Sequence, residues 1–160
     1  MSLVQSAYRG EISRKGWTTE ADLLGGQRTD ADEIASVLRD PAAQMVLAYN
    51  DSQILGCVLL RDEKGTAYIG MLAIRPEQQA QGLGRQLLQQ AEQIAAGEFK
   101  AQRARMTVII QRENLISWYV RRGYRITNQR EPFPYGNPRF GLPKRPDLQF
   151  VVLEKDLRVR

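Results

Sequence analysis

Two glycines near the middle of the chain, Gly82 and Gly84, occupy a position that suits phosphate binding. An apolar stretch ends at Arg75-Pro76, a polar loop follows, and the glycines open a long helix-forming stretch. The first N–H groups of a helix are unpaired and lie at the positive end of its dipole, so they bind anions. The segment therefore predicts a pyrophosphate-binding turn. An alternative stays open, in which the two glycines serve only the turn.

This turn fits neither of two common phosphate-binding motifs. No Gly-Lys-Ser/Thr triplet follows Gly84, as a Walker A loop requires. The third glycine of the dinucleotide fingerprint is missing together with its spacing.

The absence of histidine limits the catalytic chemistry of this chain. Ser-His and Cys-His nucleophiles and most zinc sites are excluded, and we predict no metal site. Proton transfer must then use Glu, Asp, Tyr, Lys or bound water. The one cysteine, Cys57, lies in the apolar run 54–60, and we expect a buried structural thiol there.

The elements that must position these residues predict a mixed α/β fold around one sheet, with one domain over residues 1–160. Hydrophobic periodicity, caps and turns predict helices over 3–14, 18–24, from Thr29 on, 83–96, and 114–122 with Asn114 as its N-cap. The predicted strands are 44–49, 53–61, 66–74, 106–110, 124–127 and 148–153. A loop rich in proline and glycine, 131–146, separates the last two strands.

Two segments in a fixed order resemble the two signatures of the GNAT N-acetyltransferase superfamily. The first is Gln79-x-x-Gly82-x-Gly84 after a predicted strand. In the second, Asn114 begins a short helix, Tyr119 lies five residues further on, and Gly123-Tyr124 ends it. One predicted helix and one predicted strand separate the two signatures, as in the family. The resemblance covers about residues 44–127, and the final strand more loosely.

The resemblance implies a GNAT-like fold, with a central, mostly antiparallel sheet and one splayed parallel pair of strands. Family members usually begin with a strand and then a helix. Here residues 3–10 are similar to the end of that helix, so we expect the first strand to be missing. Three alternatives stay open: the sheet is one strand short, the sequence given is truncated, or a partner covers the edge. An uncovered edge strand invites pairing, and we therefore expect a homodimer.

The resemblance also implies acetyl-CoA as the cosubstrate. The pantetheine arm would pair edge-on with the strand at Leu72, Ala73 and Ile74, and an amide near Leu72 or Ala73 would point at the thioester carbonyl. Asn114 would reach the pantetheine or its neighbouring backbone. The pyrophosphate would bind the backbone amides of Gln79, Ala80, Gln81, Gly82, Leu83, Gly84 and Arg85.

By the same resemblance, Tyr119 is the catalytic residue that protonates the departing thiolate. Ordinary pKa values of about 10 for tyrosine and about 8.5 for a thiol make direct transfer uphill by roughly 2 kcal/mol. A hydrogen bond that stabilises the thiolate, or an intervening water, would meet this difficulty. The implied reaction is direct transfer from acetyl-CoA to an amine in a ternary complex. The alternative is that Tyr119 only packs against the sheet, as we expect of Trp118.

The acceptor is predicted to be a small-molecule amine or a protein amine. Trp17 is a candidate for lining the acceptor pocket, Glu20 for binding or deprotonating the amine, and Arg28 for holding a substrate carboxylate. Glu11, Asp22 and Glu33 are rival carboxylates. Residues 1–97 carry 9 Lys and Arg against 12 Asp and Glu, which favours a small cationic amine. A packed Trp17 and a solvated Glu20 remain the alternative.

Two other functions stay open. The same fold could serve a non-catalytic CoA-binding sensor or scaffold. The basic part, residues 98–160 with 14 Lys and Arg against 6 Asp and Glu, suggests a nucleic-acid-binding domain, although no recognition helix or aromatic ribonucleoprotein motif is present. No apolar run reaches the length of a membrane span, and residues 1–6 do not resemble a signal peptide, so we expect a cytoplasmic protein.

Overall fold

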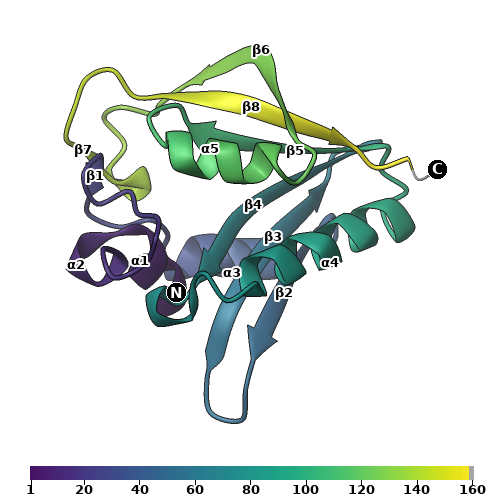
Figure 1. Ribbon diagram of the computed structural model, residues 1–160, viewed down its shortest axis with the longest axis horizontal. Helices are drawn as coiled ribbons and strands as arrows, with labels where there is room; N and C mark the ends of the chain where they lie inside the picture. The colour runs from purple at the N-terminus through teal and green to yellow at the C-terminus, as the bar shows by residue number, and fades with distance from the viewer. Residues whose placement is uncertain (159–160) are drawn as a thin grey trace.

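The structure is a computed structural model that describes residues 1–158, and Figure 1 shows a central sheet with helices packed against it. The six strands of this sheet lie in the order β2-β3-β4-β5-β8-β6, and only β4 and β5 are parallel neighbours. The strands are β2 (Ala43–Tyr49), β3 (Ile54–Asp62), β4 (Thr66–Ile74), β5 (Arg103–Ile109), β6 (Arg125–Pro132) and β8 (Gln149–Asp156). The predicted mixed α/β fold with one parallel pair is confirmed.

Helices cover both faces of this sheet. On one face, α4 buries Leu87, Leu88, Ala91 and Ala95 against the strands, and α5 packs beside it. On the other face, the first helix and α3 pack against β3 and β4 through a second apolar cluster. The helices are α1 (Ser2–Tyr8), α2 (Gly10–Ser13), α3 (Ala31–Arg39), α4 (Leu83–Gly97) and α5 (Glu113–Val120).

The parallel pair separates soon after it forms. Strands β4 and β5 are paired only where Thr66–Tyr68 lies against Arg103–Arg105. From Ile69 on, the edge of β4 that faces β5 pairs with no strand among residues 1–158, and the two strands diverge in Figure 1. The splay that the family resemblance implied is therefore present, and it opens the sheet between its two halves.

A β-bulge in β4 lies at this opening. Cys57 pairs with Ala73 and Leu59 pairs with Gly70, so two residues of β4 oppose one residue of β3. Met71, the bulged residue, has a left-handed φ of 50°, which is costly for a residue with a side chain. The bulge reverses the faces of the strand, because Ile69 packs on the α4 side whereas Met71 and Ala73 pack on the α1 side. Cys57 is buried there, as predicted.

Two helix predictions near the N-terminus are wrong. The helix predicted over 3–14 breaks at Arg9, whose backbone is extended, and restarts at Gly10 with a φ of 71°. The segment predicted as a helix over 18–24 forms turns instead and ends in a two-residue strand. A long-range contact overrides the local propensity, because the Glu20 N–H donates to the carbonyl of Tyr8 and the Glu20 side chain is buried. The two-residue strand β1 (Leu24–Gly25) pairs with β7 (Leu142–Pro143).

Helix caps lie close to, but not at, the predicted residues. Asp30 rather than Thr29 caps α3, because its carboxylate accepts a hydrogen bond of 2.7 Å from the Glu33 N–H. Arg112 rather than Asn114 is the N-cap of α5, so Asn114 lies in its first turn. Strand β6 also runs further than expected and takes in the start of the loop predicted over 131–146.

The edges of the main sheet are β2 and β6. Within residues 1–158 the first element is α1, and no strand pairs with the outer side of β2. The homodimer inferred from that edge stays a prediction. No helix in this part of the chain is long and apolar enough to cross a membrane.

Candidate active site

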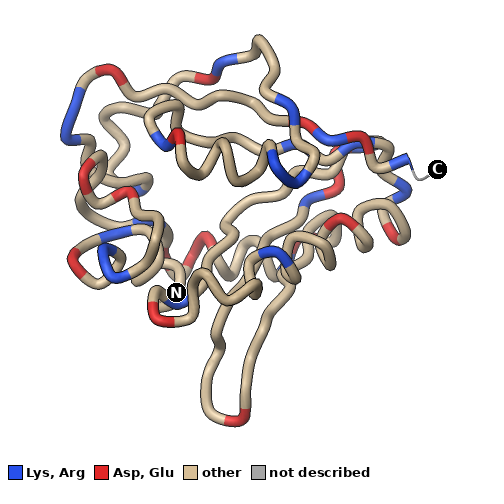
Figure 2. The backbone as a smooth tube through the Cα atoms, in the orientation of Figure 1, with Lys and Arg blue, Asp and Glu red and all other residues tan. Residues whose placement is uncertain are grey.

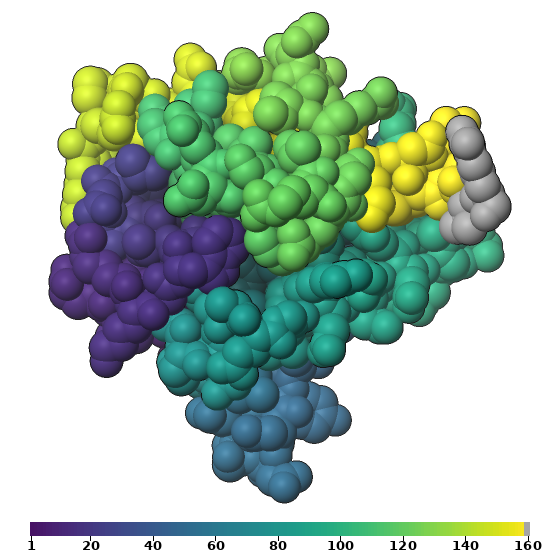
Figure 3. Space-filling view, in the orientation of Figure 1, coloured from purple at the N-terminus to yellow at the C-terminus, as the bar shows by residue number. Residues whose placement is uncertain are grey.

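Two cavities adjoin where β4 and β5 separate. The large cavity has a volume of about 270 Å³, and its charged lining is Arg9, Glu20, Arg28, Glu33 and Arg112. The narrow cavity has a volume of about 60 Å³ and is lined by residues that include Trp17, Ile74, Gln79, Gly84 and Trp118. Both cavities are lined by Tyr8, Leu72, Arg112, Leu115 and Tyr119. Figure 3 shows a crease in the surface between α1, α5 and the start of α4, the three helices that line the narrow cavity.

The start of α4 presents unpaired backbone amides. Gly82 is its N-cap with a φ of 86°, and no side chain caps the helix. The first helical hydrogen bond runs from the Gln86 N–H to the Gly82 carbonyl, 3.1 Å long. The N–H groups of Leu83, Gly84 and Arg85 have no hydrogen-bond partner within residues 1–158. A helix of this length with free N-terminal amides attracts an anion.

Gln79 acts as a clamp at the mouth of the narrow cavity. Its Oε1 accepts a 3.0 Å hydrogen bond from the Trp17 N–H, and its Nε2 donates a 3.0 Å bond to the Ile74 carbonyl. A Cβ on Gly16 would overlap the end of the Gln79 side chain, so a larger residue there would displace the Gln79 amide from this position. Trp17 lines the narrow cavity, with its ring centroid 6.4 Å from that of Trp118, and does not line the large one.

Tyr119 stands at the junction of the two cavities. Only 6% of it is exposed, and its ring packs edge-on against Trp118 at 5.1 Å and Tyr124 at 5.7 Å. Its hydroxyl has no hydrogen-bond partner within residues 1–158. Burial raises the pKa of Tyr119 above its ordinary value, so the hydroxyl is neutral and available as a donor. Trp118 packs beneath Arg122, whose guanidinium carbon lies 3.7 Å from the ring.

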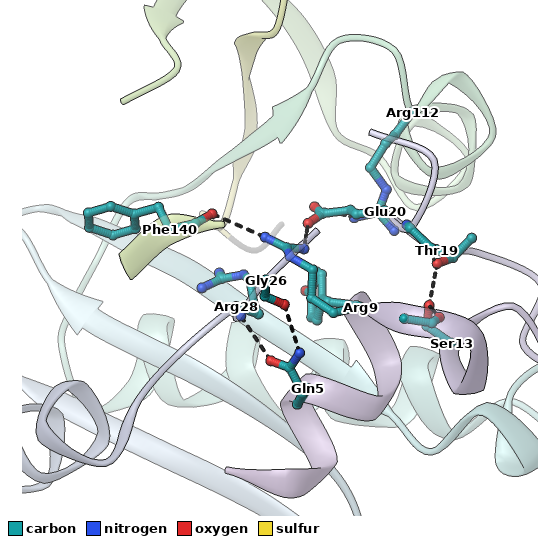
Figure 4. Close-up of polar contacts among 12 residues, drawn as sticks. Gln5, Arg9, Ser13, Thr19, Glu20, Gly26, Arg28, Arg112 and Phe140 are labelled. Carbon is teal, nitrogen blue, oxygen red and sulfur yellow. Dashed lines mark hydrogen bonds and ion pairs between the residues drawn. The ribbon is translucent and has the colours of Figure 1, made fainter. Parts of the chain in front are cut away.

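A buried ion cluster forms one wall of the large cavity. Glu20 pairs with Arg9 through one carboxylate oxygen and with Arg112 Nη1 through the other, the latter at 2.9 Å. Arg112 also donates a 2.7 Å hydrogen bond to the hydroxyl of Thr18. Figure 4 shows the Arg9 guanidinium between Glu20 and the carbonyl of Phe140. The three charged side chains are each less than a tenth exposed.

The charge state of Glu20 follows from this cluster. Burial by itself would raise the pKa of Glu20, but Arg112 and then Arg9 outweigh it, and the pKa lies below its usual range. The side chain is therefore an ionised carboxylate with both oxygens bonded. Such a group is a weak base and has no free oxygen for an amine.

Three residues of the site, Tyr8, Arg9 and Arg112, were not expected from the sequence. The Tyr8 hydroxyl donates a 2.7 Å hydrogen bond to the carbonyl of Leu72, beside the bulge in β4. Burial raises the pKa of Tyr8 to about 12, which keeps this donor neutral. Glu20 and Arg112 are 92 positions apart, so no local pattern could pair them. The one available signal was Arg9, a charge directly after the apolar stripe of α1.

The other predicted site residues lie in different parts of this region. Leu72, Ile74, Gln79 and Gly84 line the narrow cavity, and Glu20 and Arg28 line the large one. Ala73 is buried in the cluster on the α1 side of the sheet, and Asn114 is exposed and lines neither cavity. The rest of the turn, beside the start of α4, consists of Ala80, Gln81, Gly82, Leu83 and Arg85.

A sheet split between two halves, with an uncapped helix start beside the split, defines a domain of GNAT type. The model of the acetyltransferase (GNAT) family matches residues 6–124, which is most of the chain. The chain therefore belongs to the GNAT acetyltransferase family. Among proteins of curated function, none matches it in sequence.

Solved structures with the same fold are distant in sequence. A GNAT family acetyltransferase from Elizabethkingia anophelis, solved with acetyl-CoA bound, is 20% identical with a TM-score of 0.60, over 79% of this chain and 83% of its own. An IAA acetyltransferase from Bacillus cereus is 18% identical with a TM-score of 0.64, over 79% and 85%. The ribosomal-protein-S18-alanine N-acetyltransferase of Escherichia coli is 15% identical with a TM-score of 0.63, over 83% of each chain. These likenesses establish the fold.

Proposed function

We propose that this protein is an N-acetyltransferase that transfers the acetyl group of acetyl-CoA to the amine of a small molecule. The observation that carries the proposal is the free hydroxyl of Tyr119 at the junction of the two cavities. One cavity adjoins the helix start that suits phosphate, and the other is separate and large enough for an acceptor. The Tyr119 hydroxyl, a hydrogen-bond donor, lies between the two cavities, where the thiolate of CoA would form as it leaves.

The residues around the narrow cavity fit acetyl-CoA. The free amides at the start of α4 suit the pyrophosphate, and the unpaired edge of β4 from Ile69 on suits a pantetheine arm. Figure 2 shows basic residues near the start of α4 and the end of α5. A surface hollow there is lined by Arg85, Arg121, Arg122 and Lys155, with one acidic residue, Glu92, and would favour a further phosphate. When bound, acetyl-CoA supplies the activated thioester carbonyl.

In the proposed reaction Tyr119 stabilises the leaving thiolate and Glu33 accepts the proton of the amine. As the new N–C bond forms and the C–S bond breaks, the Tyr119 hydroxyl donates a hydrogen bond to the departing sulfur. Its raised pKa favours stabilisation of the thiolate over complete proton transfer. The amine loses its proton to Glu33, directly or through water, because Glu33 is the carboxylate of the large cavity that forms no ion pair within residues 1–158. Glu20 serves as a positioning residue.

An amine panel with acetyl-CoA, followed by release of free CoA thiol, tests this function. A CoA-binding sensor would bind CoA but would release no thiol, whichever amine of the panel was added. A nucleic-acid-binding domain would instead bind DNA or RNA with strong salt dependence and leave acetyl-CoA unbound. The cytoplasmic location and the homodimer remain predictions beside this proposal.

Gly82→Glu is expected to weaken binding of CoA and acetyl-CoA by at least about tenfold, or about 1.4 kcal/mol. The substitution places a negative charge at the helix start where the pyrophosphate would bind. A Cβ added at position 82 would have no heavy atom within 4 Å, so the new side chain would not clash with its surroundings. Calorimetric titration of the folded variant with CoA measures the change.

Gly65→Glu is the matched control for this experiment. Gly65 has a φ of 96°, close to the 86° of Gly82, and it too has nothing within 4 Å. Both variants therefore add the same charge and a similar backbone strain. Equal CoA affinity in the two variants would show that the turn at Gly82 is only a turn.

A further inference from the structure

The large cavity carries more positive than negative charge. Its lining includes three arginines, Arg9, Arg28 and Arg112, against two carboxylates, Glu20 and Glu33, and no lysine. Glu20 is neutralised by two of the arginines, which leaves that cluster with an excess positive charge. The cavity charge goes against the cationic acceptor that the acidic residues of 1–97 suggested. Most of those acidic residues lie elsewhere on the surface.

Arg28 differs from the other two arginines of this cavity. Arg9 and Arg112 are both bonded to Glu20. The Arg28 guanidinium forms no ion pair and no hydrogen bond with any group in residues 1–158. Its guanidinium carbon lies 5.1 Å from the centre of the Tyr8 ring, and this stacking restricts its orientation. Arg28 therefore offers a full set of donors to the cavity.

The backbone that carries Arg28 is held firmly. Gln5 donates a 2.9 Å hydrogen bond from Nε2 to the Gly26 carbonyl and accepts a 3.0 Å bond from the Arg28 N–H, as Figure 4 shows. The next residue, Thr29, is buried, and its hydroxyl donates a 2.5 Å hydrogen bond to Glu33. One anchored segment thus positions both a free guanidinium and a carboxylate in the same cavity.

We propose that Arg28 binds a carboxylate of the acceptor, so that the substrate is an amino carboxylate, such as a free amino acid, rather than a polyamine. This inference rests on the proposed acetyltransferase function and specifies its substrate class. A guanidinium matches a carboxylate through two parallel hydrogen bonds, which would orient the acceptor as well as hold it. Its amine would then face Tyr119 and the narrow cavity, within the region that Glu33 also lines. A diamine would meet excess positive charge there.

The test compares L-amino acids with their own carboxamides as acceptors. The panel pairs L-phenylalanine, L-methionine, L-lysine and L-glutamate with their amides, and adds spermidine and cadaverine as carboxylate-free amines. We expect at least one amino acid to exceed its amide in kcat/KM by about 10- to 100-fold, the usual range for a hydrogen bond to a charged group. In Arg28→Gln this preference should fall to about one, and Arg28→Lys should restore part of it.

The comparison of wild type with variant cancels the difference in basicity between an amino acid and its amide. Arg14→Gln is the control, because Arg14 is a nearby arginine that lines neither cavity. Calorimetric CoA affinity should be equal in wild type and Arg28→Gln, which shows that the variant is folded and that only the acceptor side has changed.

The outcomes separate this inference from the function on which it rests. A preference for amides or diamines, or an amino acid preference unchanged in Arg28→Gln, overturns the role of Arg28. Acetyl-CoA binding without turnover of any amine in the panel is the result expected of a CoA-binding sensor, and it overturns the acetyltransferase function together with the role of Arg28. Failure of the wild type to bind acetyl-CoA overturns the acetyltransferase function itself.

Discussion

Tyr119→Phe is expected to lower kcat by about 100-fold and to leave the affinity for acetyl-CoA unchanged. The substitution removes a hydroxyl that lies at the junction of the two cavities and has no hydrogen-bond partner in the described part of the chain, and it preserves the packing of the ring. Loss of a donor to a charged leaving group costs about 1.5–3 kcal/mol, and general acid catalysis contributes about 100-fold or more. Steady-state release of CoA thiol gives kcat, and calorimetry gives the affinity.

Tyr124→Phe is the matched control for this variant. Tyr124 is also buried and packs edge-on against Tyr119, but its hydroxyl donates a 3.0 Å hydrogen bond to Glu92 and lines neither cavity. Its loss should leave kcat unchanged. Full activity in Tyr119→Phe, or an equal loss in both variants, would mean that Tyr119 only packs.

Glu20→Gln is expected to lower the free energy of unfolding by about 3–5 kcal/mol, the usual cost of removing one partner from a buried ion pair. The variant leaves Arg9 and Arg112 buried with no counterion between them. Arg112→Met should cost less, because Glu20 keeps Arg9 and the remaining pair is neutral. Urea unfolding of both variants measures the order, and Asp156→Asn, in an exposed pair, should show no measurable change.

A reversed order, with Arg112→Met the less stable, would contradict this account of the cluster. The comparison does not require Glu20→Gln to fold. If Glu20→Gln does not fold while Arg112→Met does, Glu20→Gln is the less stable variant, as predicted.

Acid should remove the contribution of Glu20 to stability. The folded-state pKa of Glu20 lies below its value in the unfolded chain, so the carboxylate stabilises the fold above the unfolded pKa of about 4.3. That contribution is lost as the pH falls through the lower, folded-state pKa. The difference in unfolding free energy between wild type and Glu20→Gln should therefore be constant near neutral pH and shrink below about pH 4.3. A difference that does not shrink in acid would assign the loss to packing.

The elements that depend on local pattern could be predicted from the sequence. The apolar stripe of residues 83–96 has a helical period, and the structure has α4 at Leu83–Gly97. The hairpin of β2 and β3 follows from two apolar runs around a polar turn. The turn at Gly82 was visible because a left-handed residue at a helix start favours glycine. These signals lie within one or two turns of chain, where propensity and periodicity act.

The bulge in β4 could not be predicted from alternation. A strict period of two would place Ile69, Met71 and Ala73 on one face, but the extra residue opposite β3 moves the last two to the other face. This exchange brings Leu72 to both cavities. The residues around the bulge pack in two different clusters, whose members come from distant parts of the chain and lie in no single window of sequence.

The amino-acid sequence by itself determined the family, the order of the main elements, the glycine turn that opens α4 at Gly82, and the position of the tyrosine at 119 in the second signature. Each of these depends on residue types at short spacing. Only the tertiary structure decided that Glu20 pairs with Arg9 and Arg112, and that the Arg28 guanidinium has no ion-pair or hydrogen-bond partner in the described residues 1–158. The physical reason is that an ion pair depends on which charges the fold brings together, and here they come from α1, the segment before α3 and the start of α5.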